Sequence, residues 1–155
     1  MSKDARACSP DESLASAARV MWKMDCGCVP VVDDDRRVVG VVTDRDVCMA
    51  AFFRDAPLAD IAIRDAMSRQ VMTCTAEDTV RDAEDAMCSG RVRRLPVVDV
   101  AGRLVGVLSL NDIAREAERE QAIASPDVCL HEVALTLSAV GQPRDDDDPL
   151  ASVRV

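Results

Sequence analysis

Two segments of this chain place a hydroxyl residue and a carboxylate three positions apart, each directly after an apolar run. They are Thr43-Asp44-Arg45-Asp46 and Ser109-Leu110-Asn111-Asp112. This spacing is typical of a capping box, in which the two side chains satisfy backbone amides at a helix start and contribute about 1 kcal/mol. Exposed amides at a helix start also attract anions. Each segment therefore predicts a helix start that could also hold a phosphate, with a carboxylate able to accept ribose hydroxyls.

Arginines gather close to the second segment in this otherwise acidic chain: Arg91, Arg93, Arg94 and Arg103. Arg93 and Arg94 directly precede a buried-type apolar run, so either is a candidate for a charge-assisted contact with phosphate. A solvated surface or a salt bridge is the alternative role. Arg45, beside Asp46, is a similar candidate.

Cysteine chemistry is the second possibility that the sequence raises. Cys26 and Cys28 form a lone Cys-x-Cys, whereas zinc needs about four ligands, usually with wider spacing. The chain's one histidine, His131, lies far away in the sequence. Structural thiols are favoured over a metal site. Cys8 and Cys74 occupy equivalent positions and are expected to be small buried residues.

Catalytic motifs are absent from the sequence. There is one histidine, no nucleophile elbow, no phosphate-binding loop and no catalytic cysteine–histidine pair. Asp33 and Asp99 stand at equivalent turn starts, where aspartate is favoured for its bond to backbone. We therefore expect no enzyme, no catalytic residue, no catalytic cofactor and no metal.

The composition narrows the class of protein further. The 155 residues are 48% hydrophobic but only 2% aromatic, and the net charge is −9. Acidity disfavours nucleic acid and anionic membranes as partners, and few aromatics leave no stacking platform for bases. No stretch has the length of a membrane span, and the start does not resemble a secretory signal. We expect a cytoplasmic protein with its seven cysteines reduced.

An internal repeat organises the chain. Val29-Pro30-Val31-Val32-Asp33 recurs as Leu95-Pro96-Val97-Val98-Asp99, an offset of 66 residues that holds without a gap from Cys8 to Val47. Residues identical to their partners 66 later include Cys8, Ala17, Met21, Arg37, Gly40 and Asp46. A constant offset over such a length indicates two copies of one structural unit.

Each copy has the same predicted order of elements, strand–helix–strand–strand–helix. Short first strands are expected at residues 5–8 and 70–74, and hairpins at residues 28–42 and 95–108. Helix starts are predicted at Ser9–Glu12 and Thr75–Asp78, with the helices ending near residues 25 and 90. Gly40 and Gly106, inside strands, indicate a close neighbour, either a packed helix or a ligand. The fold class is α/β (α+β), two small units that must pack on each other.

The predicted divisions are two repeats at residues 5–53 and 67–124, with a linker at 54–66. The last helix of the second repeat is expected to continue to Ala124. A C-terminal amphipathic helix, with apolar positions 130, 133, 134, 137 and 140, fills 125–141, and a flexible acidic tail fills 142–155.

These repeats resemble the cystathionine β-synthase (CBS) domain. The resemblance rests on Val-x-Gly-Val-Val-Thr-Asp-Arg-Asp-Val in the first copy and Leu-Val-Gly-Val-Leu-Ser-Leu-Asn-Asp-Ile in the second, and covers about residues 5–120. It implies a pseudo-two-fold pair of β-α-β-β-α repeats with two clefts, often forming a homodimer. Such pairs typically bind AMP, ADP, ATP or S-adenosylmethionine and regulate a partner protein.

The resemblance also implies roles for individual residues. Thr43 and Ser109 would contact phosphate, and Asp46 and Asp112 would hold the ribose. The adenine would meet backbone near residues 6–8 and 71–73, and near the residues before each proline. The implied nucleotide-binding set is Thr43, Arg45, Asp46, Val71, Thr73, Arg93, Arg94, Leu95, Pro96, Ser109, Asn111 and Asp112. The first copy departs from the second where Cys26-Gly27-Cys28 replaces Val92-Arg93-Arg94.

Three hypotheses follow. The first is a sensor of adenine nucleotides that acts on an unidentified protein partner. The second is a structural dimerisation module with empty clefts, and the third is a thiol- or metal-responsive protein. The sequence does not distinguish AMP, ATP and S-adenosylmethionine as the ligand.

Overall fold

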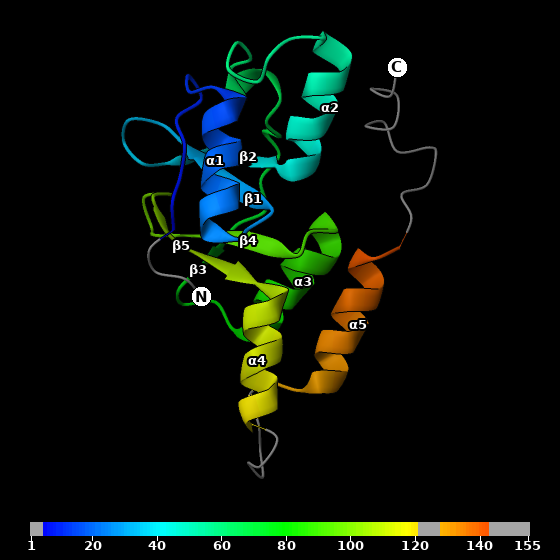
Figure 1. The fold of residues 1–155 in the computed structure, drawn as a ribbon. Coiled ribbons are helices and arrows are strands. Elements are labelled where there is room, and N and C mark those ends of the chain that lie inside the picture. Colours follow the sequence, from blue (N-terminus) through cyan, green and yellow to red (C-terminus); the bar gives the residue numbers. More distant parts are fainter. Residues whose placement is uncertain (1–4, 121–127, 143–155) are drawn as a thin grey trace. The chain divides into compact units, whose positions relative to one another are not determined.

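The computed structural model describes residues 5–120 and 128–142, which form two compact units (Figure 1). One unit contains residues up to Asp78 together with Leu95–Leu108, and the other contains Thr79–Arg94 and the residues from Ser109 on. The predicted end of a helix at Ala124 and most of the predicted tail fall outside the described residues. None of the described helices is both long and apolar enough to cross a membrane.

The first unit holds both hairpins. β1 (Cys28–Val32) pairs antiparallel with β2 (Val38–Thr43), and α1 (Leu14–Met24) and α2 (Asp44–Arg54) pack on them. A second sheet has the order β3 (Cys74–Thr75), β4 (Arg94–Val98) and β5 (Leu104–Ser109), with β3 parallel to β4. These strands agree with the predicted hairpins, and the mixed α+β class is confirmed.

The expected first strands are shorter than predicted. Cys8 makes a single parallel bridge to Val31, and its equivalent Cys74 pairs with Val97 at the start of the two-residue β3. Both cysteines are buried, as predicted. Residues 70–73 have no strand partner in the described part of the chain.

Equivalent turns of the two hairpins contact each other. Val38 N–H donates to Gly102 O at 3.2 Å, and Leu104 N–H donates to Arg36 O at 2.9 Å. Each of these bonds becomes the other when 66 is added to or subtracted from its residue numbers. Asp33 and Asp99 each accept two backbone amides of their own turns, the role predicted for them. The repeat therefore has a local two-fold relation at these turns.

The predicted starts of the first helix in each copy are wrong by four residues. α1 begins after Ser13, whose hydroxyl accepts Ser16 N–H at 3.4 Å. The residues before Ser13 cannot join the helix because they pair with the linker: Glu12 O accepts Ile63 N–H at 2.8 Å. In the second copy Thr75 belongs to β3, so the cap moves to Thr79.

The linker docks into the core of the first unit. η1 (Ile63–Asp65) carries the fully buried Ile63, and Ile61 is 2% exposed. Ser68 exchanges two backbone hydrogen bonds with Val41, at 2.9 and 3.0 Å. A Cβ on Gly40 would stand 2.6 Å from Met67 Sδ and 3.0 Å from Ser68 O. Gly40 is therefore required by the close approach of Met67 and Ser68, which directly follow the predicted linker.

The second unit consists of three helices: α3 (Val80–Gly90), α4 (Leu110–Glu120) and α5 (Leu130–Val140), with α5 packed on both others (Figure 1). α5 begins at Leu130, and residues 125–127 of the predicted range 125–141 lie outside the described part. Its predicted apolar face is wrong in part. Val133 is buried, but Leu130 and Leu137 are exposed and Thr136 is buried instead.

A buried acid explains the orientation of α5. Glu84 of α3 is 6% exposed, and the hydroxyl of Thr136, 4% exposed, donates to Glu84 Oε1 at 3.4 Å. A buried carboxyl group requires such a partner. Burial is the main cause that raises the pKa of Glu84; the nearby carboxylates of Glu132 and Asp85 add to it, whereas Thr136 and Arg81 oppose it.

This acid should make stability depend on pH. Folded protein holds the Glu84 proton more tightly than unfolded protein, so the group favours folding most below its ordinary pKa of 4.5. That contribution is lost as pH rises through the higher folded-state pKa. We expect Glu84→Gln to weaken the decline in urea-unfolding free energy with rising pH and to stabilise the protein near neutrality. The control is Glu118→Gln, at an exposed glutamate of α4. Parallel pH profiles for wild type and Glu84→Gln would contradict the assignment.

Candidate functional site

The start of α4 contains the predicted pair Ser109 and Asp112. Asp112 Oδ2 accepts Ser109 N–H at 2.9 Å and Ser109 Oγ–H at 2.6 Å, and Asp112 N–H donates back to Ser109 Oγ at 3.1 Å. Burial alone would raise the pKa of Asp112, but these bonds and Arg115 lower it below its ordinary value. The carboxylate is therefore ionised at neutral pH and acts only as an acceptor.

The start of α2 has the same construction. Asp46 Oδ2 accepts Thr43 N–H at 2.8 Å and Thr43 Oγ1–H at 2.7 Å. Asp46 N–H donates to Thr43 Oγ1 at 3.2 Å, which completes a capping box. Both predicted capping interactions are thus present, and each leaves Oδ1 of the aspartate outside the box.

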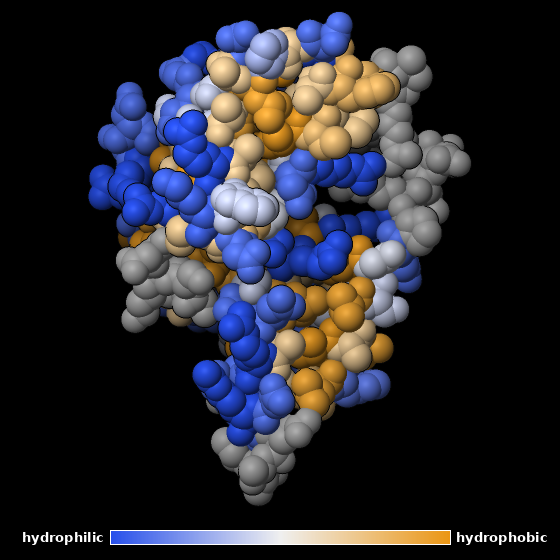
Figure 2. All heavy atoms as spheres, viewed as in Figure 1, coloured by the Kyte–Doolittle hydropathy of each residue, from blue (hydrophilic) through white to orange (hydrophobic). Residues whose placement is uncertain are grey.

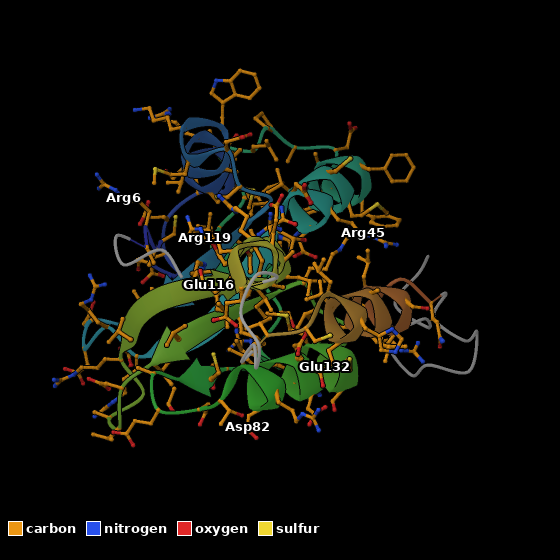
Figure 3. All side chains as sticks on the ribbon, turned by 90° about the horizontal axis from the view of Figure 1, so that it is seen from below. Arg6, Arg45, Asp82, Glu116, Arg119 and Glu132 are labelled. Atoms are coloured by element: carbon orange, nitrogen blue, oxygen red, sulfur yellow. The ribbon has the colours of Figure 1, made fainter. Side chains whose placement is uncertain are left out.

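A third capping box was missed by the sequence analysis. At the start of α3, Asp82 Oδ2 accepts Thr79 N–H at 2.9 Å and Thr79 Oγ1–H at 2.6 Å. Hydrogen bonds from Thr79 lower the pKa of Asp82. The spacing Thr79-x-x-Asp82 was visible in the sequence, but Thr75-x-x-Asp78 four residues earlier was preferred. The capping geometry alone therefore does not identify a ligand site, and Asp82 offers an internal control (Figure 3).

The residue directly before each hairpin is hydrogen-bonded to the capped helix that follows the hairpin. Arg93 O accepts Leu110 N–H, the first amide of α4, at 3.0 Å, and the equivalent Gly27 O accepts Asp44 N–H of α2 at 3.1 Å. Arg93 is exposed and Arg94 half-buried. No ion pair joins either of them to a carboxylate of the described residues. An unpaired arginine thus stands directly beside the start of α4, where the start of α2 has a glycine.

The other predicted residues fall into different surroundings. Arg45 and Asn111, next to the two aspartates, are exposed, as is Thr73, whereas Val71 is half-buried. Leu95 and Pro96 are buried in β4, so only their backbone could meet a ligand. The structure brings Arg93, Ser109, Asn111 and Asp112 together within one unit. Val71, Thr73, Leu95 and Pro96 belong to the other unit.

Arg115 is a neighbour of this cluster that the sequence analysis missed. Its Nη2 lies 3.7 Å from Asp112 Oδ1, and its Nε–H donates to Asn111 O at 3.3 Å. The i, i+3 spacing from Asp112 is the signal that could have identified it. Arg115 also lines a shallow hollow on α4 with Asn111, Ala114, Glu118 and Leu130.

The thiols fall into two groups. Burial, reinforced by Glu12, raises the pKa of Cys8 to about 11, and burial also raises the pKa of Cys74. Both are therefore inert thiols at neutral pH. Cys26 and Cys28 are partly exposed. Among residues 5–120 and 128–142, no group of three or more Cys, His, Asp or Glu residues is arranged to hold a metal ion.

The repeated hairpin and capped helix, joined through equivalent turns, define a tandem-repeat α+β module. The sequence profile of the CBS domain matches residues 1–52 and 63–119. The chain therefore belongs to the CBS domain family, as the resemblance implied, and carries two CBS repeats.

Known proteins support this assignment. An uncharacterised 17.7 kDa protein of Acidianus ambivalens is 36% identical over 106 residues, 68% of this chain and 63% of that protein. The match thus spans less than two thirds of that relative. The solved structure of CBSX2 in complex with AMP is 27% identical, with a TM-score of 0.65, covering 75% of this chain and 89% of CBSX2. The CBS pair of MJ0100, solved with 5′-methylthioadenosine and S-adenosylmethionine, is 27% identical with a TM-score of 0.66, covering 74% and 92%.

The thiol hypothesis gives a direct test. We expect Cys26→Ser/Cys28→Ser protein to keep its melting temperature and its affinity for adenine nucleotides within a few-fold. Purified wild type should contain less than one equivalent of zinc by elemental analysis. One equivalent of zinc in wild type, lost in the double variant, would instead support a metal-responsive protein.

Proposed function

We propose that this chain is a regulatory module that binds an adenine nucleotide at the start of α4, catalyses no reaction and signals to a partner protein. The observation that carries the proposal is Asp112, an ionised carboxylate whose Oδ2 is used by the cap while Oδ1 lies outside the cap, 3.7 Å from Arg115 Nη2. An ionised carboxylate with an oxygen outside the cap is a strong acceptor for ribose hydroxyls. The AMP complex of the similar CBSX2 supports this choice of ligand.

In the proposed complex Asp112 would serve the cap through Oδ2 and the ligand through Oδ1, whereas Ser109 would exchange its hydroxyl bond to Asp112 for one to the ligand. Asp112 would accept ribose hydroxyls, while Ser109 Oγ and the amides at the helix start would face the phosphate. Arg93 would supply a charge-assisted contact, because its backbone is bonded to the first residue of α4. The pair Thr43 and Asp46, with Arg45, would form a second and weaker site at α2. Val71, Thr73, Arg94, Leu95, Pro96 and Asn111 remain proposed contacts.

Calorimetric titration with AMP, ATP and S-adenosylmethionine tests the proposal. A nucleotide at 100 times its Kd should stabilise the wild type by about 2.7 kcal/mol if it binds only folded protein. Asp112→Asn should lower nucleotide affinity about ten- to a hundred-fold, because a charged acceptor for the ribose is lost. Asp82→Asn weakens a cap of the same geometry and should lower stability slightly without changing affinity.

A 2′,3′-dideoxy nucleotide removes the same contact from the ligand side. Its affinity penalty should largely vanish in Asp112→Ala, as expected when two changes delete one interaction. Equal penalties in wild type and variant would show that Asp112 only caps its helix. No stabilisation by any adenine compound at millimolar concentration would favour the structural dimerisation module.

The helices of the first unit expose apolar side chains that support a homodimer. Trp22 of α1 is 88% exposed and Phe52 of α2 is 75% exposed. The ring of Phe53 packs edge-on against that of Phe52, with 5.2 Å between the ring centroids. Hydrophobic residues gather over the upper part of α2 in Figure 2. A helix that is apolar on its outer as well as its inner face normally has a partner on both. A second copy of the chain is the partner we propose.

Light scattering should therefore give the mass of a dimer for the wild type. Phe52→Asp/Phe53→Asp should shift the mass toward the monomer with unchanged helix content, because a dimer would bury these charges without partners. Val100→Asp, at a fully exposed turn position, is the control and should leave the mass unchanged. A wild type with monomer mass at all concentrations would contradict the proposal.

A further inference from the structure

The two capped helix starts differ in charge at equivalent positions. The offset of 66 pairs Gly27 with Arg93, Cys28 with Arg94, Asp44 with Leu110, Arg45 with Asn111, Asp46 with Asp112, and Met49 with Arg115. The start of α4 thus has three arginines against one carboxylate, whereas the start of α2 has one arginine against two carboxylates. Helix dipole and capping geometry are shared by both, so the side-chain charges alone distinguish them.

Arg115 is the arginine whose position is fixed by contacts. Its Nε–H is bonded to Asn111 O, and its Nη2 lies 3.7 Å from Asp112 Oδ1. Oδ2 of Asp112 is already occupied by two bonds from Ser109. A ligand hydroxyl that reaches Asp112 must therefore bind Oδ1, beside the guanidinium of Arg115. Any charged group next to that hydroxyl meets Arg115.

The hollow on α4 shows how far the positive charge extends. Arg115 lines it together with Asn111, Ala114 and Leu130, and Glu118 lines it about two helical turns beyond Asn111. The guanidinium therefore faces both Asp112 and the hollow, and the next charge along α4 on this side is negative. The positive charge is confined to the first turns of α4, close to the proposed ribose position.

We propose that Arg115 makes the α4 site selective for anionic adenine nucleotides over S-adenosylmethionine. This inference rests on the proposed function and assigns the charge class of its ligand. A phosphate beside Asp112 gains a charge-assisted contact with the guanidinium, whereas the sulfonium of S-adenosylmethionine is repelled by it. The α2 site, with Met49 in place of Arg115, has no such preference for phosphate and accepts adenosine ligands that lack it.

Replacing Arg115 with the residue of the other copy tests this inference. The full chain carrying Asp46→Asn isolates the α4 site, and AMP, adenosine and S-adenosylmethionine are titrated with and without Arg115→Met. AMP affinity should fall about five- to ten-fold, since an exposed charged contact contributes modestly, and adenosine affinity should stay within about two-fold. S-adenosylmethionine should bind more tightly than before. Arg115→Lys, which keeps the charge, should restore most of the AMP affinity.

The control is Arg119→Met. Arg119 lies on the same helix and pairs with Glu116 at 3.1 Å, also with i, i+3 spacing (Figure 3). This variant should leave all three affinities unchanged. Equal losses for AMP and adenosine in Arg115→Met, or an unchanged AMP affinity, would overturn the selectivity while leaving the proposed function intact. A wild type that binds none of the three compounds would overturn the proposed function itself, and the selectivity with it.

Discussion

The junction between a strand and the helix that follows it is the constraint on which both repeats depend. A helix start leaves amides without intrahelical partners, and a junction packed against a hairpin must satisfy them. In each repeat a carbonyl of the preceding segment, Gly27 O or Arg93 O, accepts the first helical amide. A hydroxyl and a carboxylate then satisfy further amides. These bonds fix where α2 and α4 begin, and so where their side chains point.

This arrangement limits what a ligand can use. In Asp112 one oxygen is committed to Ser109, so the proposed ligand would have only the other oxygen of the carboxylate. The same box at Thr79 and Asp82 has Asp85 in the place that Arg115 has after Ser109, so a cap can be present without that arginine. The charged residues next to the cap differ between the two copies, and the selectivity proposed for Arg115 rests on that difference.

Polar contacts also position the C-terminal helix of the second unit. α5 is tied to α3 by a buried polar pair, Glu84 and Thr136, and by the exposed ion pair of Arg81 and Glu132. A buried acid is a poor source of stability, but it defines one orientation of a helix whose leucines could have packed in several. Because α5 also packs on α4, Glu84 and the helix that carries Asp112 lie in the same compact unit.

The sequence by itself determined the features that depend on short-range spacing. The offset of 66 residues revealed the two repeats, short apolar runs separated by polar turns predicted the hairpins, and the caps at Asp46 and Asp112 followed from residues three positions apart. Charge differences between the copies were also visible, because equivalent positions could be aligned without a structure.

Tertiary structure decided the features that depend on distant partners. Ser9 and Glu12 had the spacing of a cap, but the linker took the backbone bonds of that segment and moved the start of α1 to Leu14. α5 buries Thr136 because the buried Glu84 requires a hydroxyl partner. This requirement outweighed the burial of Leu130 and Leu137. Gly40 is required because Met67 and Ser68 approach it closely, and a local sequence pattern cannot reveal those neighbours. Local hydrogen bonds are encoded within a few residues, whereas packing is settled only when segments far apart in the chain compete for the same surface.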